Sequence, residues 1–382
     1  MSTFDVIVIG AGINGSATAY DLRNKQHKNV LLLEQFPLPH TRGSSHGQTR
    51  VIRCLYHKRI YSQMTMDSFP IWRDLERQTN ETLFIQNGML EIYDNTTDSE
   101  KLNLSKKVLN DLNVPYKVLN TEEINRKYKP LHFEGDYSAI FESVGGTLMA
   151  NKCLQAFQTL YREAGGVLHD NEQVKQIIPG NDLVTVLTNK SQFKTKSLVI
   201  TAGSFVSKLL KPLHLHLPLT IQRNHLCFWR VHNDGEGTLE AGFPSFKTPY
   251  LTYGTASIEY PGLMKICSHG GPSVDIDYPD QPPNMDDVTK LVTKHMKNVD
   301  HKPAIVENCL YTVSPDRDFI LDRHPIYPNI VIGTGFSGTG FKMSPVTGQI
   351  LASLALNKNT KYDLSRFKIS RFENVLKMKA SL

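Results

Sequence analysis

Glycines near the start of the chain have the spacing of a phosphate-binding turn. Residues 10–15 read Gly-Ala-Gly-Ile-Asn-Gly, which fits G-x-G-x-x-G, and they directly follow the apolar run 4–9. In such a turn Gly10 permits the tight bend, Gly12 lets a pyrophosphate approach the backbone, and Gly15 lets a helix pack against the strand. The N–H groups at the start of that helix then face the phosphates. The pattern predicts a dinucleotide site.

An acidic residue stands where such a site needs one. Glu34 ends a second apolar run, residues 29–33, and lies 19 residues after Gly15. A carboxylate there accepts hydrogen bonds from a ribose diol. The motif alone does not separate NAD from FAD, and glycines at the end of a strand also arise from ordinary turns.

Two later segments have the same apolar pattern of a buried strand. Residues 196–204 and 328–335 are apolar runs that stop at glycine, and we expect both to join the first sheet. Ser344 and Pro345 then open a predicted helix. Its N-terminus would point at a bound ligand, although a plain turn between strand and helix explains the glycines equally well.

Composition limits the class of protein. The chain has 382 residues, 40% hydrophobic and 21% charged, which excludes a disordered or collagen-like protein and favours two domains. Lys and Arg number 43 against 37 Asp and Glu, a net charge of +6 that is not gathered into a basic run. Nucleic acid is therefore not expected as a partner, whereas small anions are. Five cysteines, an odd number, favour a reducing compartment.

Targeting signals are sparse. No apolar run approaches the roughly 20 residues that span a bilayer, and the N-terminus lacks the features of a signal peptide. We expect a soluble intracellular protein with no membrane partner. The final tripeptide Ala380-Ser381-Leu382 is close to the S-K-L pattern but has Ser in place of the cation. It hints at the peroxisome and its import receptor, with the cytoplasm as the alternative.

Changes in the hydrophobic pattern along the chain predict two interleaved domains. We expect a dinucleotide-binding α/β domain built from residues 1–82, 138–217 and 308–382. Short alternating runs such as residues 88–93, mixed with polar helix candidates such as residues 98–112, fill the remainder. Residues 83–137 and 218–307 are expected to form a second, sheet-rich domain.

Several blocks spread over the chain resemble one family. The residues 42–53, 259–265, 309–312, 319–325 and 335–342 are similar, in the same order, to the flavoproteins of the monomeric sarcosine oxidase and pipecolate oxidase family. The resemblance implies FAD, a Rossmann-like domain of the glutathione-reductase type, and a substrate domain over the flavin. It also implies contacts to the cofactor from Gly10, Gly12, Gly15, Glu34, Arg42, Ser44, Ser45, His46, Thr49, Arg50, Val174, Ala202, Gly203, Gly338, Gly340 and Lys342.

Cys309 matches the family cysteine that forms a thioether to the flavin ring. A tether of this kind needs a thiolate, and nearby cations lower the pKa of a thiol. Without the resemblance nothing ranks Cys309 above the other four cysteines, since a free cysteine is usually a small buried hydrophobe.

Four matches concern the substrate. Arg53 and Lys342 match the pair that holds the substrate carboxylate, a task that suits a guanidinium fork and a buried ammonium. Tyr311 and His269 match residues that line the same pocket and could orient or deprotonate the amine. Taken alone, each of these side chains is more often structural.

Two cations match positions beside the flavin ring. Lys265 and Arg50 would stabilise negative charge that develops during reaction with oxygen, and oxygen activation is assigned to Lys265. His46 lies in the same loop and either contacts the ring or serves only as a turn histidine. The chain departs from the family at Thr339 and at Cys267 and Ser268, so the preferred substrate is the least transferable inference.

These observations together predict a monomeric oxidase of small secondary amino acids such as sarcosine or L-pipecolate, with O2 as acceptor, hydrogen peroxide as product and no metal. The alternatives are an oxidase of bulkier N-alkyl amino acids, a dehydrogenase that passes electrons to a protein, and a dinucleotide-binding sensor without turnover.

Overall fold

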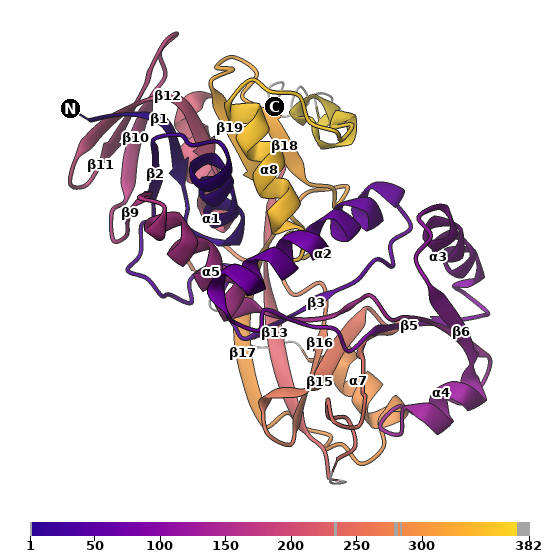
Figure 1. Cartoon of the computed structure of the whole chain (residues 1–382). Helices are drawn as coiled ribbons and strands as arrows, with labels where there is room; N and C mark the ends of the chain where they lie inside the picture. The colour runs from indigo at the N-terminus through magenta and orange to yellow at the C-terminus, as the bar shows by residue number, and fades with distance from the viewer. Residues whose placement is uncertain (1, 233–234, 279–281, 283–284, 373–382) are drawn as a thin grey trace, which may run out of the picture.

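Two lobes and a long connecting helix make up the chain. The computed structural model describes residues 2–232, 235–278, 282 and 285–372, so the C-terminal tripeptide lies outside the described residues. Helix α2 (Arg59–Thr79) crosses between a lobe that holds both the first and the last strands and a lobe built from the middle of the chain (Figure 1). Within the described ranges no helix is long and apolar enough to cross a membrane.

The first sheet is the predicted dinucleotide-binding sheet. Its strands are β10 (Val174–Ile178), β11 (Val184–Thr188), β12 (Gln192–Ile200), β1 (Ser2–Ile9), β2 (Val30–Leu33) and β9 (Val167–His169), with β19 (Ile330–Thr334) beside β12 and β18 (Ile320–Arg323) beside β19. Strand β1 is parallel to both β12 and β2. Ile7 and Ile9 pack into one apolar cluster and Val6 and Val8 into another, which confirms a strand buried on both faces.

Four helices pack together against this sheet (Figure 1): α1 (Ile13–Tyr20), α2, α5 (Ala150–Glu163) and α8 (Ser344–Ala355). Helix α8 begins at Ser344 with Pro345 in its first turn, as predicted. It lies close to α1, since a Cβ on Gly348 would stand 2.8 Å from the Ala17 carbonyl carbon. The two helices that follow the first and last parallel strands therefore start side by side.

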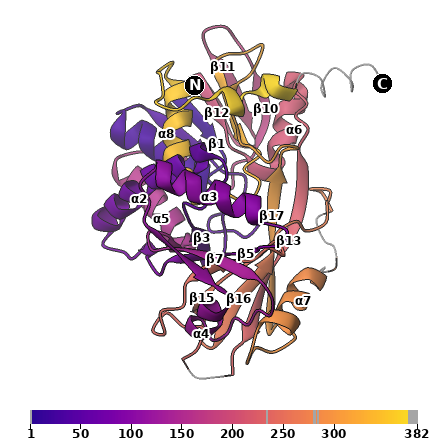
Figure 2. The same cartoon turned by 90° about the vertical axis from the view of Figure 1, so that its right-hand side faces the viewer.

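The second sheet has eight strands in the order β17 (Ile305–Val313), β13 (Thr220–Arg230), β16 (Leu263–Ser268), β15 (Thr252–Tyr260), β14 (Ser245–Lys247), β5 (Met89–Asp94), β7 (Tyr137–Glu142) and β6 (Tyr116–Asn120). Strands β13 and β17 are long and extend from one lobe toward the other (Figure 2). The expected domain boundaries at 137/138 and 307/308 fall within β7 and β17, both of which pair in this sheet. The division into domains stays a prediction.

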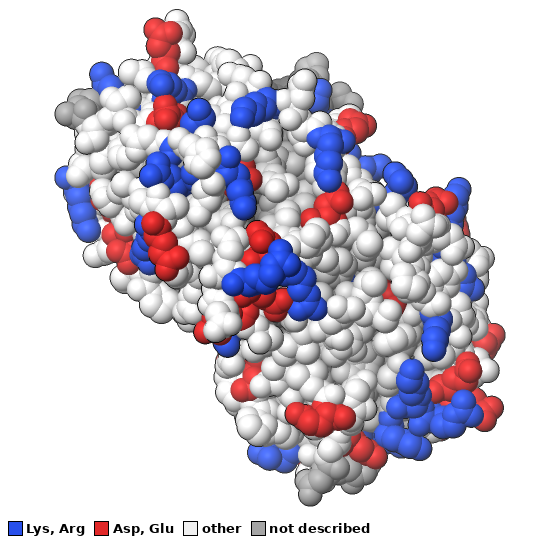
Figure 3. Space-filling model, viewed as in Figure 1, with Lys and Arg blue, Asp and Glu red and all other residues white. Residues whose placement is uncertain are grey.

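A small sheet and four further helices complete the fold. Strands β3 (Thr49–Ile52), β8 (Gly146–Met149) and β4 (Phe84–Ile85) form a three-stranded sheet. Helix α6 (Val206–Leu210) follows β12, while α3 (Ser99–Asp111), α4 (Thr121–Lys127) and α7 (Asp286–His295) lie in the second lobe. The first sheet, parallel from β9 through β2, β1 and β12 to β19 with antiparallel strands β10, β11 and β18 added, and the sheet-rich second lobe confirm the predicted fold class. Acidic and basic side chains are interspersed over the face seen in Figure 3.

Candidate active site

The glycine-rich turn has the geometry its spacing predicts. Gly10 has φ +99°, and a Cβ there would stand 2.6 Å from the Thr201 carbonyl oxygen, at the end of β12 beside Ala202. A Cβ on Gly15 would stand 1.9 Å from the carbonyl oxygen of Gly10. Only glycine fits at either position, because the backbone itself occupies the space of a side chain.

The start of α1 is free of acidic side chains. Gly12 is the N-cap and offers no side chain, and the Ile13 N–H donates instead to Ser45 Oγ at 3.0 Å. Helix N-termini carry partial positive charge and orphan N–H groups, which together favour an anion. This end of α1 therefore suits the pyrophosphate of a dinucleotide.

Glu34 is fixed at the carboxyl end of β2. Its Oε2 accepts from the Ala11 N–H at 2.9 Å and its Oε1 from the Phe36 N–H at 3.1 Å. The backbone N–H of Glu172 donates to the Glu34 carbonyl, which brings Val174 into the same region. The carboxylate is thus oriented beside the glycine turn, where a ribose would lie.

The loop after β2 carries the other predicted contacts to the cofactor. His46 lies between two carbonyls, at 2.8 Å from both Gly43 O and Asn308 O, and burial lowers its pKa. Arg50 donates to the Ser44 carbonyl at 3.1 Å and to the His46 carbonyl. The hydroxyl of Ser44 bonds to the Leu310 carbonyl in β17, whereas Arg42 lies over the Phe36 ring. These contacts fix the loop against the second sheet.

One small cavity brings together four of the predicted site residues, Arg50, Lys265, Cys309 and Tyr311, whereas His46, Arg53, His269 and Lys342 do not line it. It is lined by Thr49, Arg50, Val51, Leu226, Tyr253, Thr255, Lys265, Cys309 and Tyr311. These side chains come from β3 of the small sheet and from β13, β15, β16 and β17 of the second sheet. Residues far apart in the sequence therefore meet at one place.

Cys309 is 3% exposed on β17. Burial raises the pKa of its thiol, while Arg50 and Lys265 act in the opposite direction. The net shift is upward, so the prediction that nearby cations supply a thiolate is not met by the protein alone.

Lys265 is buried beside two oxygen-bearing side chains. Its Nζ lies 2.9 Å from Glu259 Oε1 and 3.3 Å from Thr49 Oγ1. The side chains of Lys265 and Glu259 are only 4% and 2% exposed. A fixed ammonium in a dry setting stabilises an oxygen anion more strongly than it would in water.

A group of cations surrounds His269. Burial, with Lys247, Lys342, Arg53 and Arg317 nearby, lowers the pKa of His269 to about 3. Burial, with Arg53 and Arg50 nearby, also lowers the pKa of Lys342 to about 7. The predicted carboxylate pair thus lies in a strongly positive region next to a neutral imidazole.

The turn before α8 packs against the ring of Tyr311. A Cβ on Gly338 would stand 2.6 Å from a ring carbon of Tyr311, and one on Gly340 would stand 2.5 Å from Phe336 Cβ. The His269 ring stacks on Tyr253 with centroids 4.4 Å apart and lies 6.2 Å from the ring of Tyr311. Gly203, with φ +52°, begins a short 3-10 helix after β12, in which the Ser204 hydroxyl lies 3.2 Å from the hydroxyl of Thr312 in β17.

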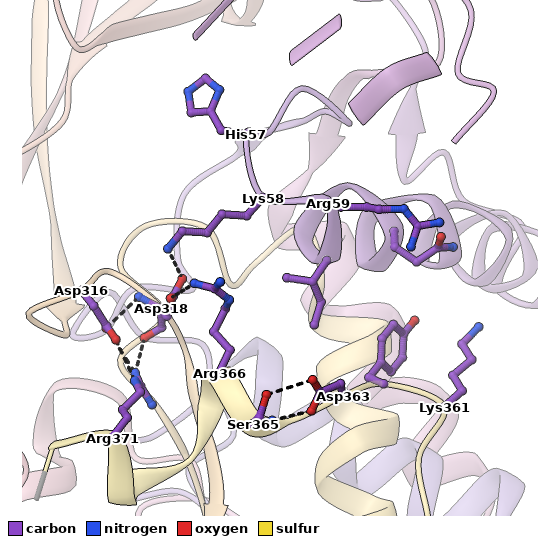
Figure 4. A pocket seen from close by; sticks show the side chains of 13 residues that line it. His57, Lys58, Arg59, Asp316, Asp318, Lys361, Asp363, Ser365, Arg366 and Arg371 are labelled. Carbon is purple, nitrogen blue, oxygen red and sulfur yellow. Dashed lines mark hydrogen bonds and ion pairs between the residues drawn. The ribbon is translucent and has the colours of Figure 1, made fainter. Parts of the chain in front are cut away.

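An open pocket of about 850 Å³ lies elsewhere, between the start of α2 and the turns near residue 366 (Figure 4). Lys58 and Arg366 both pair with Asp318, and Arg371 pairs with Asp316. None of the predicted site residues lines this pocket. Within the described ranges no three His, Cys, Asp or Glu side chains are grouped to hold a metal.

Comparison with known proteins decides the family. A family described as "DAO: FAD dependent oxidoreductase" matches residues 5–354. The chain belongs to this family and is an FAD-dependent oxidoreductase. It is 40% identical to human peroxisomal sarcosine oxidase over 97% of each chain, and 33% identical to monomeric sarcosine oxidase of Bacillus sp. strain NS-129 over 97% of this chain and 98% of that one.

Solved structures support the same assignment. The amino acid oxidase NikD has a TM-score of 0.81 at 25% identity, over 96% of this chain and 98% of its own. L-proline dehydrogenase from P. horikoshii has a TM-score of 0.84 at 21% identity, over 98% of each chain, and so shows the fold alone. The predicted resemblance to the sarcosine oxidase family is confirmed.

The glycine turn, the start of α1 and Glu34 fit FAD, since the N-cap Gly12 leaves the helix N-terminus without a side chain and Glu34 is held beside it. Three charged residues near the flavin-facing side were missed as functional candidates: Glu91, Lys247 and Glu259. Glu91 carried a usable signal, because a carboxylate inside the apolar strand β5 must find a buried cation.

Proposed function

We propose that the chain oxidises small secondary amino acids, with sarcosine and L-pipecolate as first candidates, and passes the electrons to O2. The supporting observation is that the matched residues Arg50, Lys265, Cys309 and Tyr311 line one cavity. Arg53 and Lys342 lie with His269 in the adjoining positive region. For sarcosine the balanced reaction with O2 and water gives glycine, formaldehyde and hydrogen peroxide.

Two cationic side chains bind the substrate. Arg53 and Lys342 bind the carboxylate and orient the molecule, because a guanidinium offers a fixed fork of donors and an ammonium adds a point charge. FAD, when bound, accepts the hydride equivalent from the amine and is reoxidised by O2.

The amine must be neutral to lose a hydride. The cations around His269 disfavour a further positive charge, so they lower the pKa of the substrate ammonium. His269 remains neutral at physiological pH and accepts a hydrogen bond from the amine. This arrangement favours deprotonation without a strong base.

Oxygen reacts near Lys265. Its buried ammonium stabilises the negative charge that develops on oxygen, and Glu259 and Thr49 hold Nζ in place. Arg50 adds a second positive charge to the same cavity.

Oxygen uptake and peroxide formation test the proposal. We expect both with sarcosine, L-pipecolate or another N-alkyl amino acid. Dye reduction without oxygen uptake would assign the chain as a dehydrogenase, and full flavin occupancy without reduction by any such substrate would favour a sensor.

We also propose covalent attachment of FAD through Cys309, a monomeric enzyme, and import into the peroxisome. Human and mouse relatives named as peroxisomal support the location. Import is tested with an N-terminal fluorescent fusion. Peroxisomal fluorescence that is lost on removal of Leu382 supports the proposal, and cytoplasmic fluorescence of the intact fusion contradicts it.

A further inference from the structure

Three charged side chains, among them the predicted carboxylate ligand Arg53, form a triad around the buried Glu91. Glu91 Oε2 lies 2.9 Å from Arg53 Nη1, and Glu91 Oε1 lies 2.5 Å from Lys247 Nζ. The side chains of Arg53, Glu91 and Lys247 are 14%, 4% and 22% exposed. Two cations thus share one carboxylate.

Strand pairing fixes this arrangement. Strands β14 and β5 are parallel, with Lys247 directly opposite Glu91. Arg53 follows β3 and is held from the other side by the ring of Tyr56, 4.3 Å from its guanidinium carbon. Strand pairing therefore sets the position of Lys247, and Arg53 is placed directly after the end of β3.

Stability does not explain the triad. Replacing a buried ion pair with apolar side chains of similar volume is often neutral or stabilising. An apolar pair at positions 91 and 247 would lie on the face of β5 that carries Met89 and Tyr93, which belong to another apolar cluster. A role in binding an anionic ligand accounts for the charged side chains at these positions.

Positive charge exceeds negative charge at this place. Lys247, Arg53, Lys342 and Arg317 all act on His269. Glu91 offsets one of these four charges. Glu142, also near Arg53, does not offset another, because burial raises its pKa to about 8 and keeps the carboxyl largely neutral at pH 7. A single substrate carboxylate leaves the region positive.

Both shared cations keep donors for a ligand. Among the described residues Arg53 donates through Nη1 only, and Lys247 donates a single hydrogen bond to Glu91. A guanidinium has five N–H donors and an ammonium has three. Because both cations contact one carboxylate, they lie close enough for a molecule with two carboxylates a few bonds apart to reach both.

We propose that the site selects a secondary amino acid with a second carboxylate, which Lys247 binds while Arg53 and Lys342 bind the first. This inference rests on the proposed function. The simplest such substrate is iminodiacetate, which is sarcosine with a carboxylate on its methyl group. Loss of a hydride and a proton forms a C=N bond, and water then splits it. With O2 as acceptor, iminodiacetate, O2 and water give glycine, glyoxylate and hydrogen peroxide.

The test compares matched ligands on the flavin-loaded enzyme. Values of kcat/KM are measured for iminodiacetate and sarcosine, and dissociation constants are measured from flavin absorbance for thiodiacetate and methylthioacetate. These two thioethers replace the amine with sulfur, so their binding is measured without turnover. Wild-type enzyme is expected to favour the dicarboxylate in each pair.

Substitutions test which charged side chains cause the preference for the dicarboxylate. Lys247→Leu should lower the preference for the dicarboxylate roughly tenfold, measured both as the ratio of kcat/KM values and as the ratio of binding affinities. This is the effect expected for loss of one charged hydrogen bond. Lys247→Arg should retain the preference, and Glu91→Gln should raise it, since it removes a repelling charge. Lys196→Leu serves as the control, since the Lys196 side chain on β12 is exposed and pairs with Asp5.

The two failures are distinguishable. If sarcosine is oxidised but both ratios are the same in wild type and Lys247→Leu, the second carboxylate site is wrong and the proposed function stands. If no secondary amino acid reduces the flavin, the proposed function is wrong, and the thioether ratio alone decides whether Lys247 binds a carboxylate.

Discussion

Lys265 and Glu259 form an ion pair 2.9 Å long that is closed to solvent on both sides. Glu259 Oε2 has no hydrogen-bond partner among the described residues. Glu259 Oε1 also accepts a hydrogen bond from the Thr49 hydroxyl, so this one oxygen holds both side chains. The Lys265 ammonium is held at the cavity that also contains Cys309 and Arg50.

Removing this ammonium should slow the reaction with oxygen. We expect Lys265→Met to reduce the rate of flavin reoxidation about 100-fold, the scale of losing one preorganised electrostatic partner, with a smaller effect on reduction by substrate. Stopped-flow absorbance measures the two half-reactions separately. Lys265→Met/Glu259→Gln controls for the carboxylate left unpaired. Equal slowing of both half-reactions would remove Lys265 from the oxygen step.

Cys309 should be the anchor of the flavin. In wild type the yellow colour should remain in the acid-precipitated protein, whereas Cys309→Ala should release it to the supernatant. The control is Cys267→Ala, since Cys267 is fully buried on β16, which is separated from β17 by β13, and belongs to the same apolar cluster. Colour retained by Cys309→Ala would show that another residue is the anchor.

Lys342 should make carboxylate binding depend on pH. Its pKa is lowered to about 7, so the ammonium is charged below that pH and neutral above it. The dissociation constant of methylthioacetate, which has no amine to titrate, should therefore rise as pH increases above about 7. In Lys342→Met binding should be weaker by roughly tenfold at low pH, the worth of one charged hydrogen bond, and the change near pH 7 should be lost, leaving only the ionisation of Glu142, whose pKa is about 8. A change near pH 7 that persists in the variant would assign it to another group.

Gly15 should be intolerant of any side chain. Gly15→Ala places a methyl group against the Gly10 carbonyl and should lower the free energy of unfolding by about 3 kcal/mol or more. The ratio of flavin to protein absorbance should fall as well. Thermal unfolding and absorbance spectra check both effects, with Gly43→Ala as control, since its nearest contact for a Cβ is 3.9 Å away. Normal flavin content in Gly15→Ala would contradict the close-packed turn.

Local patterns in the sequence predict the first sheet well. The run 4–9, the glycine spacing and the helix that opens with Ser344 and Pro345 each depend on neighbours in the chain. Burial of β1 on both faces and the start of α8 follow from them. Such features are set by backbone conformation and hydrophobic periodicity, which a short stretch of sequence contains.

The charged site could not be predicted in this way. Glu91 and Lys247 meet because β5 and β14 pair, although they are 156 residues apart. Glu259 reaches Lys265 through the hairpin of β15 and β16. The resemblance supplied Lys265 but no partner for it, since spacing does not reveal which side chains face one another across a sheet. The residue type at one position can indicate that a charge is buried, but it does not show which side chain neutralises that charge.

Anaerobic titration of the purified yellow protein with sarcosine, L-pipecolate, iminodiacetate and N-methyl-L-aspartate tests the central claim most directly. The account predicts that at least one of them bleaches the visible flavin band and that air restores the band with formation of peroxide. A band that no secondary amino acid bleaches would contradict it.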